Sequence, residues 1–147
     1  MSIALRLGLH YITQNPPSST GEDRGSIVLV SSTSGYFGTT GNAAYIASKH
    51  GTVGLLRASQ AKAAALGIRV NSIAPSYTPT YITAGFGDTI EQAGLATNTP
   101  DMVGLAIVYA AVDPERKGTC CLVSSDRSSG MLLCTMCKPA NIFSIML

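Results

Sequence analysis

Two short apolar runs without alternation, separated by a long helical stretch, constrain the fold of this chain more than any other feature. Residues 26–31 (SIVLVS) and 68–74 (IRVNSIA) are rich in β-branched side chains and lack the apolar–polar alternation of a half-exposed strand. Such runs are typical of strands buried on both faces of a parallel sheet. Since parallel strands need a crossover, usually a helix, the pattern predicts an α/β fold.

The segment between the two runs has the composition and the caps of a helix. Residues 42–66 are rich in alanine and leucine, with Asn42 as a good N-cap and Gly67 as a good C-terminal stop. The same reasoning predicts helices over 2–13 and 100–112 and a third strand over 119–124. We therefore expect a partial Rossmann-like parallel sheet of about three strands with flanking helices.

The length of the chain limits it to a single domain. It has 147 residues, within the size of one ordinary domain. Charged residues make up only 12%, against roughly 25% in typical globular proteins. This composition excludes disorder and predicts an unusually apolar surface, part of which we expect something to cover. Residues 125–147 show no clear period, and we leave this tail unassigned.

The charge balance excludes some classes of partner. A net charge of +2 is too small to indicate nucleic acid or an anionic membrane as a partner. Residues 25–86 contain no acidic side chain, and the basic residues in and next to this segment are Arg24, Lys49, Arg57, Lys62 and Arg69. They fit either an anionic ligand or an ordinary solvated helix face, and both interpretations stay open.

Membrane, secretion and metal signals are weak. The longest apolar stretch, 104–112, is far shorter than the roughly 20 residues that span a bilayer, and the N-terminus does not resemble a secretory signal. All four cysteines lie in the last 28 residues, so they form no disulfide framework for the chain. Cys134 and Cys137 form a CxxC without the spaced second pair of a zinc site, and we expect no metal. A reducing, cytoplasmic location is expected.

The residues that can carry chemistry follow the first apolar run. Tyr45 and Lys49 are four residues apart near the start of the long helix and therefore share one face. A neighbouring ammonium and a helix N-terminus both lower the pKa of a phenol, so that Tyr45 can exchange a proton near neutral pH. Ser31 and Ser32, at the end of the run, can hydrogen-bond a substrate oxygen or simply cap the strand. A tyrosine and a lysine at this spacing are also common on helices without any catalytic role.

Three segments together resemble the catalytic half of the short-chain dehydrogenase/reductase family. They are GSIVLVSSTSG, AAYIASKHGTVGLL and GIRVNSIAPSYTPT, in the order and spacing of that family. The resemblance implies that Ser32 is the catalytic serine and that Tyr45 is the general acid/base. It implies that Lys49 lowers the pKa of the tyrosine and binds the nicotinamide ribose, and that Thr80 helps to hold the cofactor.

The resemblance also implies a reaction class and its partners. Hydride would pass between NAD(P)(H) and a carbonyl or alcohol carbon of a small molecule, with NADP preferred over NAD. The amino-acid sequence of residues 45–60 and 76–83 is similar to that of reductases of fungal secondary metabolism. A bulky lipophilic substrate is expected because the loops that line the family's pocket are aromatic here, at Tyr36, Phe37, Tyr77, Tyr81 and Phe86. A homo- or hetero-oligomer is implied through the helix at 42–66.

Several parts of the family pattern are absent from this sequence. It contains no glycine-rich TGxxxGxG turn for the pyrophosphate and no asparagine in the helix over 2–13, and Ser76 stands where the family usually has glycine. We therefore expect residues 1–124 to be a truncated dehydrogenase domain without the N-terminal cofactor-binding half, followed by the tail 125–147. Two functions stay open: an oxidoreductase, and a non-catalytic relative that acts as an interaction partner or has no activity.

Overall fold

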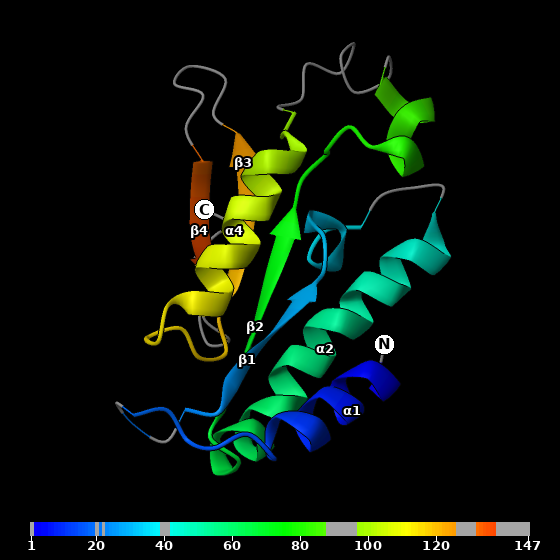
Figure 1. The fold of residues 1–147 in the computed structure, drawn as a ribbon. Helices are drawn as coiled ribbons and strands as arrows, with labels where there is room; N and C mark the ends of the chain where they lie inside the picture. Colours follow the sequence, from blue (N-terminus) through cyan, green and yellow to red (C-terminus); the bar gives the residue numbers. More distant parts are fainter. Residues whose placement is uncertain are drawn as a thin grey trace.

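A computed structural model of the chain shows helices on both faces of a four-stranded sheet (Figure 1). The structure describes residues 2–19, 21, 23–38, 42–87, 97–125 and 132–137. The strand order is β1-β2-β3-β4, with β1, β2 and β3 parallel and β4 antiparallel to β3. The predicted α/β class and its three parallel strands are therefore confirmed.

The elements follow the predicted order. The helices are α1 (Ser2–Ile12), α2 (Ala43–Ala65) and α4 (Pro100–Val112), and the strands are β1 (Gly25–Val30), β2 (Ile68–Pro75), β3 (Cys120–Ser125) and β4 (Leu132–Cys137). Two short 3₁₀ helices, η1 (Thr33–Gly35) and η2 (Tyr81–Phe86), lie in the loops after β1 and β2. Each predicted helix and strand is present to within two residues at either end.

Strand β2 lies at the centre of the fold and divides the core in two. Ile68, Val70 and Ala74 belong to a core cluster with α1 and α2, whereas Ile73 packs with α4 and β3 on the opposite face. Alternate residues of a strand point to opposite faces, so a strand covered on both sides needs apolar residues in both sets. This double burial explains the run without alternation.

The caps of α2 are those that the sequence predicts. Asn42 Oδ1 accepts a hydrogen bond from Tyr45 N at 3.3 Å, which satisfies one free donor of the first turn. At the other end Gly67 has φ of +64°, a conformation that residues with a Cβ rarely adopt. The N-cap Asn42 thus fixes the backbone of Tyr45 in the first turn of α2.

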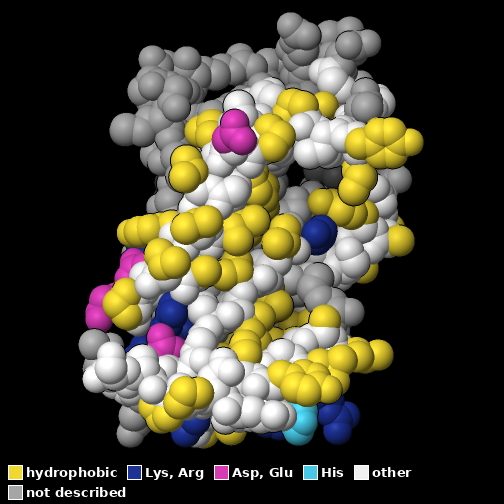
Figure 2. All heavy atoms as spheres, viewed as in Figure 1, with side chains coloured by type: hydrophobic (Ala, Val, Ile, Leu, Met, Phe, Trp, Pro, Cys, Tyr) yellow, Lys and Arg dark blue, Asp and Glu magenta, His cyan; other side chains and the backbone are white. Residues whose placement is uncertain are grey.

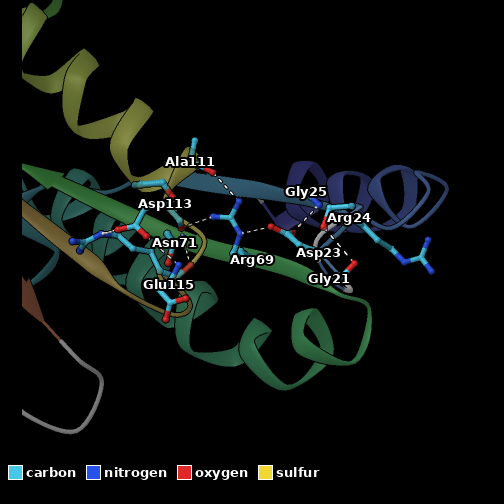
Figure 3. A network of polar contacts seen from close by, with 12 residues as sticks. Gly21, Asp23, Arg24, Gly25, Arg69, Asn71, Ala111, Asp113 and Glu115 are labelled. Atoms are coloured by element: carbon cyan, nitrogen blue, oxygen red, sulfur yellow. Dashed lines mark hydrogen bonds and ion pairs between the residues drawn. The ribbon is translucent and has the colours of Figure 1, made fainter.

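Polar residues on the α4 face of β2 bind the end of α4 (Figure 3). Arg69 is 8% exposed, forms an ion pair with Asp23 at 2.7 Å, and donates to the carbonyls of Ala111 and Asp113 at 2.9 Å. Asn71, fully buried, donates to Ala110 O at 3.1 Å. These carbonyls lie at the C-terminus of the helix, where intrahelical donors run out.

This network corrects one interpretation of the basic segment. Arg69 lies neither on a solvated helix face nor at a site for an anionic ligand, because its guanidinium is buried and already bonded to Asp23 and two carbonyls. Arg69 is also the second residue of β2, opposite Ser26 near the start of β1, whereas Ser31 and Ser32 come after the last residue of β1. The charge of Arg69 therefore stabilises the fold, by joining β2 to Asp23 and to the end of α4.

Strand β4 is an element that the sequence analysis left unassigned. Residues 132–137 of the tail pair with β3 in antiparallel register, from Ser125↔Leu132 to Cys120↔Cys137. Its residues, LLCTMC, form a short apolar run that begins soon after Gly130 and ends shortly before Pro139. Those breakers are the signal from which the strand could have been predicted.

The outer faces of the helices carry many apolar side chains. On α4 four exposed residues recur at helical spacing: Leu105, Val108, Tyr109 and Val112. Figure 2 shows hydrophobic side chains gathered over α4. Despite this apolar surface, no helix among the described residues is long and apolar enough to cross a membrane.

Candidate active site

The candidate site lies where β1 ends and α2 begins. The chain leaves β1 at Val30, passes through Ser31 and Ser32 into η1, and enters α2 at Ala43. Ser31 N donates to Ile73 O at 2.8 Å, so the end of β1 stays paired with β2. Because the carboxyl ends of parallel strands lie at one edge of the sheet, residues after β1 and after β2 meet there.

Tyr45 and Lys49 are brought together as the sequence predicts. Tyr45 lies in the first turn of α2 and is 43% exposed. The Lys49 ammonium lies 5.4 Å from the centroid of the Tyr45 ring and donates to Val30 O at 3.1 Å. The lysine thus links the tyrosine to the last residue of β1, and places a positive charge beside the ring.

Ser32 lies at the same edge but is engaged locally. It is 9% exposed, accepts from Ser34 N at 3.2 Å as the N-cap of η1, and donates to Pro75 O at 3.3 Å. The bond to Pro75 joins the ends of β1 and β2. Both interpretations of this serine, a cap and a donor near the site, are therefore compatible with its position.

Thr80 and Ser76 lie on the loop after β2. The Thr80 hydroxyl is exposed and lies 3.2 Å from Thr83 Oγ1, and within the described part of the chain it forms no hydrogen bond with Tyr45, Lys49 or Ser32. The Ser76 hydroxyl accepts from Asn98 Nδ2 at 3.0 Å. Ser76, at the position where the family usually has glycine, is thus bonded to Asn98, the residue before the N-cap of α4.

Asn98 is a residue of this region that sequence reasoning missed. It is 1% exposed, and its Nδ2 also donates to Val123 O at 2.8 Å, so it joins the loop after β2 to β3. Its backbone N–H donates to Tyr77 O at 2.9 Å. In the sequence, an asparagine two residues before Pro100, where a helix begins, looks like any other loop residue. Its role is visible only in the structure, where it bonds to Tyr77 in the loop after β2 and to Val123 in β3.

Gly35 is a second residue that the sequence analysis did not single out. A Cβ on Gly35 would lie 2.6 Å from Ser31 Oγ, 2.9 Å from Lys49 O and 3.1 Å from Val53 Cγ2. Two of these three neighbours belong to α2. The absence of a side chain therefore lets η1 pack directly on the turn of α2 that carries Lys49.

Replacing Gly35 by alanine is expected to lower the free energy of unfolding by about 1–3 kcal/mol, because the added methyl group overpacks a buried contact. Urea denaturation followed by circular dichroism measures the change. Gly38→Ala is the matched control, since nothing lies within 4 Å of its added Cβ. Equal stability of the two variants would contradict the close packing of η1 on α2.

The described residues offer no metal centre. Within them, no three His, Cys, Asp or Glu side chains come together in a group that could hold a metal ion. The CxxC of Cys134 and Cys137 lies on β4, and its side chains are outside the described part of the structure. The Lys49 ammonium and the Tyr45 phenol lie together at the site, and the Ser32 hydroxyl lies at the same edge of the sheet; such groups suit proton transfer and hydrogen bonding.

Known proteins share these segments. The family model "short chain dehydrogenase" matches residues 9–91, more than half of the chain. Short-chain dehydrogenase/reductase prx4 of Penicillium roqueforti is 36% identical over 89 residues, which cover 60% of this chain and 27% of the relative. The 5′-hydroxyaverantin dehydrogenase of Dothistroma septosporum is 30% identical over 118 residues, covering 76% and 39%. The chain thus spans less than half the length of these relatives.

Solved structures agree. The crystal structure of 3-hydroxyacyl-CoA dehydrogenase type-2 from Mycobacterium avium superposes with a TM-score of 0.72 and 31% identity, over 80% of this chain and 48% of that one. A 4-hydroxyisoleucine dehydrogenase mutant complexed with NADH and succinate gives 0.61 and 25%, over 67% and 45%. With the fold, the order of the motifs and the family model in agreement, the chain belongs to the short-chain dehydrogenase family.

Proposed function

We propose that this chain carries the catalytic half of an NAD(P)-dependent oxidoreductase that acts on a carbonyl or alcohol group of a small lipophilic metabolite. The observation that carries the proposal is the Lys49 ammonium, 5.4 Å from the Tyr45 ring centroid, at the strand end that Ser32 follows. Exposed aromatic side chains on the neighbouring loops, Phe37 and Tyr81, support a lipophilic substrate. Fungal relatives that include a 5′-hydroxyaverantin dehydrogenase support a role in secondary metabolism.

The donor set fits the nicotinamide end of a dinucleotide. The Lys49 ammonium and the half-exposed Tyr45 phenol suit the hydroxyls of a ribose, and the exposed Thr80 hydroxyl suits a carboxamide. The cofactor supplies or accepts the hydride when it is bound. NADH in the related 4-hydroxyisoleucine dehydrogenase supports a nicotinamide cofactor, and we propose NADP for this chain.

The residues of the chain then handle the proton. In the reducing direction Tyr45 Oη donates its proton to the carbonyl oxygen, and the Lys49 ammonium stabilises the phenolate that remains. The Ser32 hydroxyl donates to the same oxygen and stabilises its developing negative charge. Since the Ser32 to Pro75 bond is long at 3.3 Å, turning the hydroxyl toward a substrate costs little. In the oxidising direction the proton returns to Tyr45.

The proposal is tested on the purified 147-residue chain. It is titrated with NADPH and with NADH while nicotinamide fluorescence is followed, and then assayed with a panel of aromatic and aliphatic ketones. We expect saturable binding and consumption of the reduced cofactor. A chain that binds neither cofactor and reduces no ketone contradicts activity of this chain alone.

Replacing Ser32 by alanine is expected to lower kcat by about 10²-fold, because one donor to the developing oxyanion is lost. The loss is measured by steady-state kinetics of cofactor consumption. Ser18→Ala is the control, because Ser18 is an exposed loop serine whose hydroxyl donates to Gly21 O, within its own loop, at 3.3 Å. A Ser32→Ala variant as active as Ser18→Ala would show that the serine is only a cap of η1.

A non-catalytic role as an interaction partner is the second candidate. It is favoured by the outer face of α2, where a Cβ added at Gly51 or Gly54 would meet no other atom within 4 Å. Such an open helix face suits packing against another helix. Co-purification with a complete relative supports this function, whereas a stable monomer that binds no relative contradicts it.

A further inference from the structure

Ser31 has a role that differs from that of its neighbour Ser32. It follows directly after β1 and is 2% exposed, so its hydroxyl is almost entirely removed from water. Ser31 Oγ donates to Lys49 O at 3.1 Å, whereas Ser32 Oγ donates to Pro75 O. Adjacent residues in extended backbone point to opposite sides. One serine therefore contacts α2 and the other contacts the end of β2.

The hydrogen bond of Ser31 reaches the backbone of α2 well inside the helix. Lys49 is the seventh residue of α2, and a carbonyl there has a second lone pair beyond the one used by the helix ladder. A side-chain donor can occupy it without breaking the ladder. The bond thus ties the turn that carries Lys49 to the end of β1.

Gly35 encloses this bond. The closest approach to its missing Cβ is Ser31 Oγ at 2.6 Å, followed by Lys49 O at 2.9 Å, so η1 packs over both partners. The packing excludes water that would otherwise compete for the hydroxyl. The Ser31 bond is therefore protected, and its loss leaves Lys49 O without that partner.

Both ends of Lys49 are held by two consecutive residues. Its carbonyl accepts from the Ser31 side chain, and its ammonium donates to Val30 O at 3.1 Å. The same ammonium lies 5.4 Å from the centroid of the Tyr45 ring. We propose that Ser31 is a positioning residue, which fixes the backbone of Lys49 so that its ammonium rests on Val30 beside Tyr45. Its catalytic consequence depends on the proposed function, but the positioning does not.

The test measures the chemical reactivity of Lys49. The folded chain is labelled with an amine-acylating reagent, and the rate at each lysine is determined by mass spectrometry. In Ser31→Ala we expect Lys49 to react about fivefold faster than in the wild type, the factor that corresponds to loss of one protein hydrogen bond. Lys62, exposed near the end of the same helix, is the internal reference and keeps its rate.

Ser59→Ala is the matched control variant. Ser59 is 8% exposed, lies on α2, and donates to Leu56 O at 3.0 Å, so it loses a similar hydrogen bond at the other end of the helix. We expect its Lys49 to react at the wild-type rate. An unchanged Lys49 rate in Ser31→Ala overturns the proposal, and so does an equal rise at Lys49 and Lys62, which indicates general loosening of α2.

This experiment is independent of catalysis. It needs neither cofactor nor substrate, so a chain that proves inactive in the ketone assay still gives a result. Selective acceleration at Lys49 in an inactive chain supports the positioning role and contradicts only the activity. Where the wild type is active, Ser31→Ala is expected to lower kcat more than it raises KM, because the Ser31 hydroxyl is buried and bonded to Lys49 O.

Discussion

Replacing Arg69 by methionine is expected to lower the free energy of unfolding by about 3 kcal/mol. The side chain keeps most of its aliphatic volume in this change but loses its donors. The carbonyls of Ala111 and Asp113, which it binds at 2.9 Å, are left without that donor beside a buried strand. Asp23 also loses its ion-pair partner, although its carboxylate keeps the hydrogen bond from Gly25 N at 3.0 Å, is 31% exposed and is rehydrated in part. Urea denaturation measures the loss.

The control is Arg57→Met on the exposed face of α2. The chemical change is the same, but Arg57 is exposed, so its removal is expected to alter stability by no more than about 0.5 kcal/mol. The difference between the two variants isolates the contribution of the buried contacts at the end of α4. If both variants are equally stable, the network in Figure 3 does not hold the helix to the sheet.

The same contrast shows why part of the fold could be predicted from the sequence and part could not. The strands β1 and β2 and the helix between them follow from local patterns: two apolar runs, Asn42 as a cap and Gly67 as a stop. A buried arginine within such a run indicates only that partners exist. The partners of Arg69 are Asp23 and the carbonyls at the end of α4. They are more than 40 residues away in the sequence, so no local pattern could have identified them.

The candidate site divides in a similar way. The spacing of Tyr45 and Lys49 places them on one helix face, and the structure brings the ammonium and the ring together as expected. Sequence could not separate the roles of Ser31 and Ser32, because which hydroxyl turns toward α2 depends on the direction of the backbone after β1. The need for Gly35 was also hidden, since it arises from the close approach of η1 to α2.

Replacing Tyr45 by phenylalanine is expected to lower kcat for ketone reduction by about 10²- to 10⁴-fold, because the general acid is lost. Only the phenol oxygen is removed. Among the described residues this oxygen takes part in no hydrogen bond, and the ring is 43% exposed, so stability is expected to change by no more than about 0.5 kcal/mol. Steady-state cofactor consumption and a parallel urea titration separate the two effects.

Tyr109→Phe is the matched control for this loss. Tyr109 is 47% exposed and lies on α4, with Arg116 4.3 Å from its ring centroid, so it shares the exposure and the cationic neighbour of Tyr45. Unlike that of Tyr45, its phenol oxygen also accepts a hydrogen bond, from Arg116 Nη2 at 2.7 Å. Tyr109 does not lie at the end of β1. If both variants lose activity equally, removing the hydroxyl of any exposed tyrosine beside a cation lowers activity, and Tyr45 is not identified as the general acid. If only Tyr45→Phe fails, the proton comes from the first turn of α2, beside the strand end that Ser31 and Lys49 join.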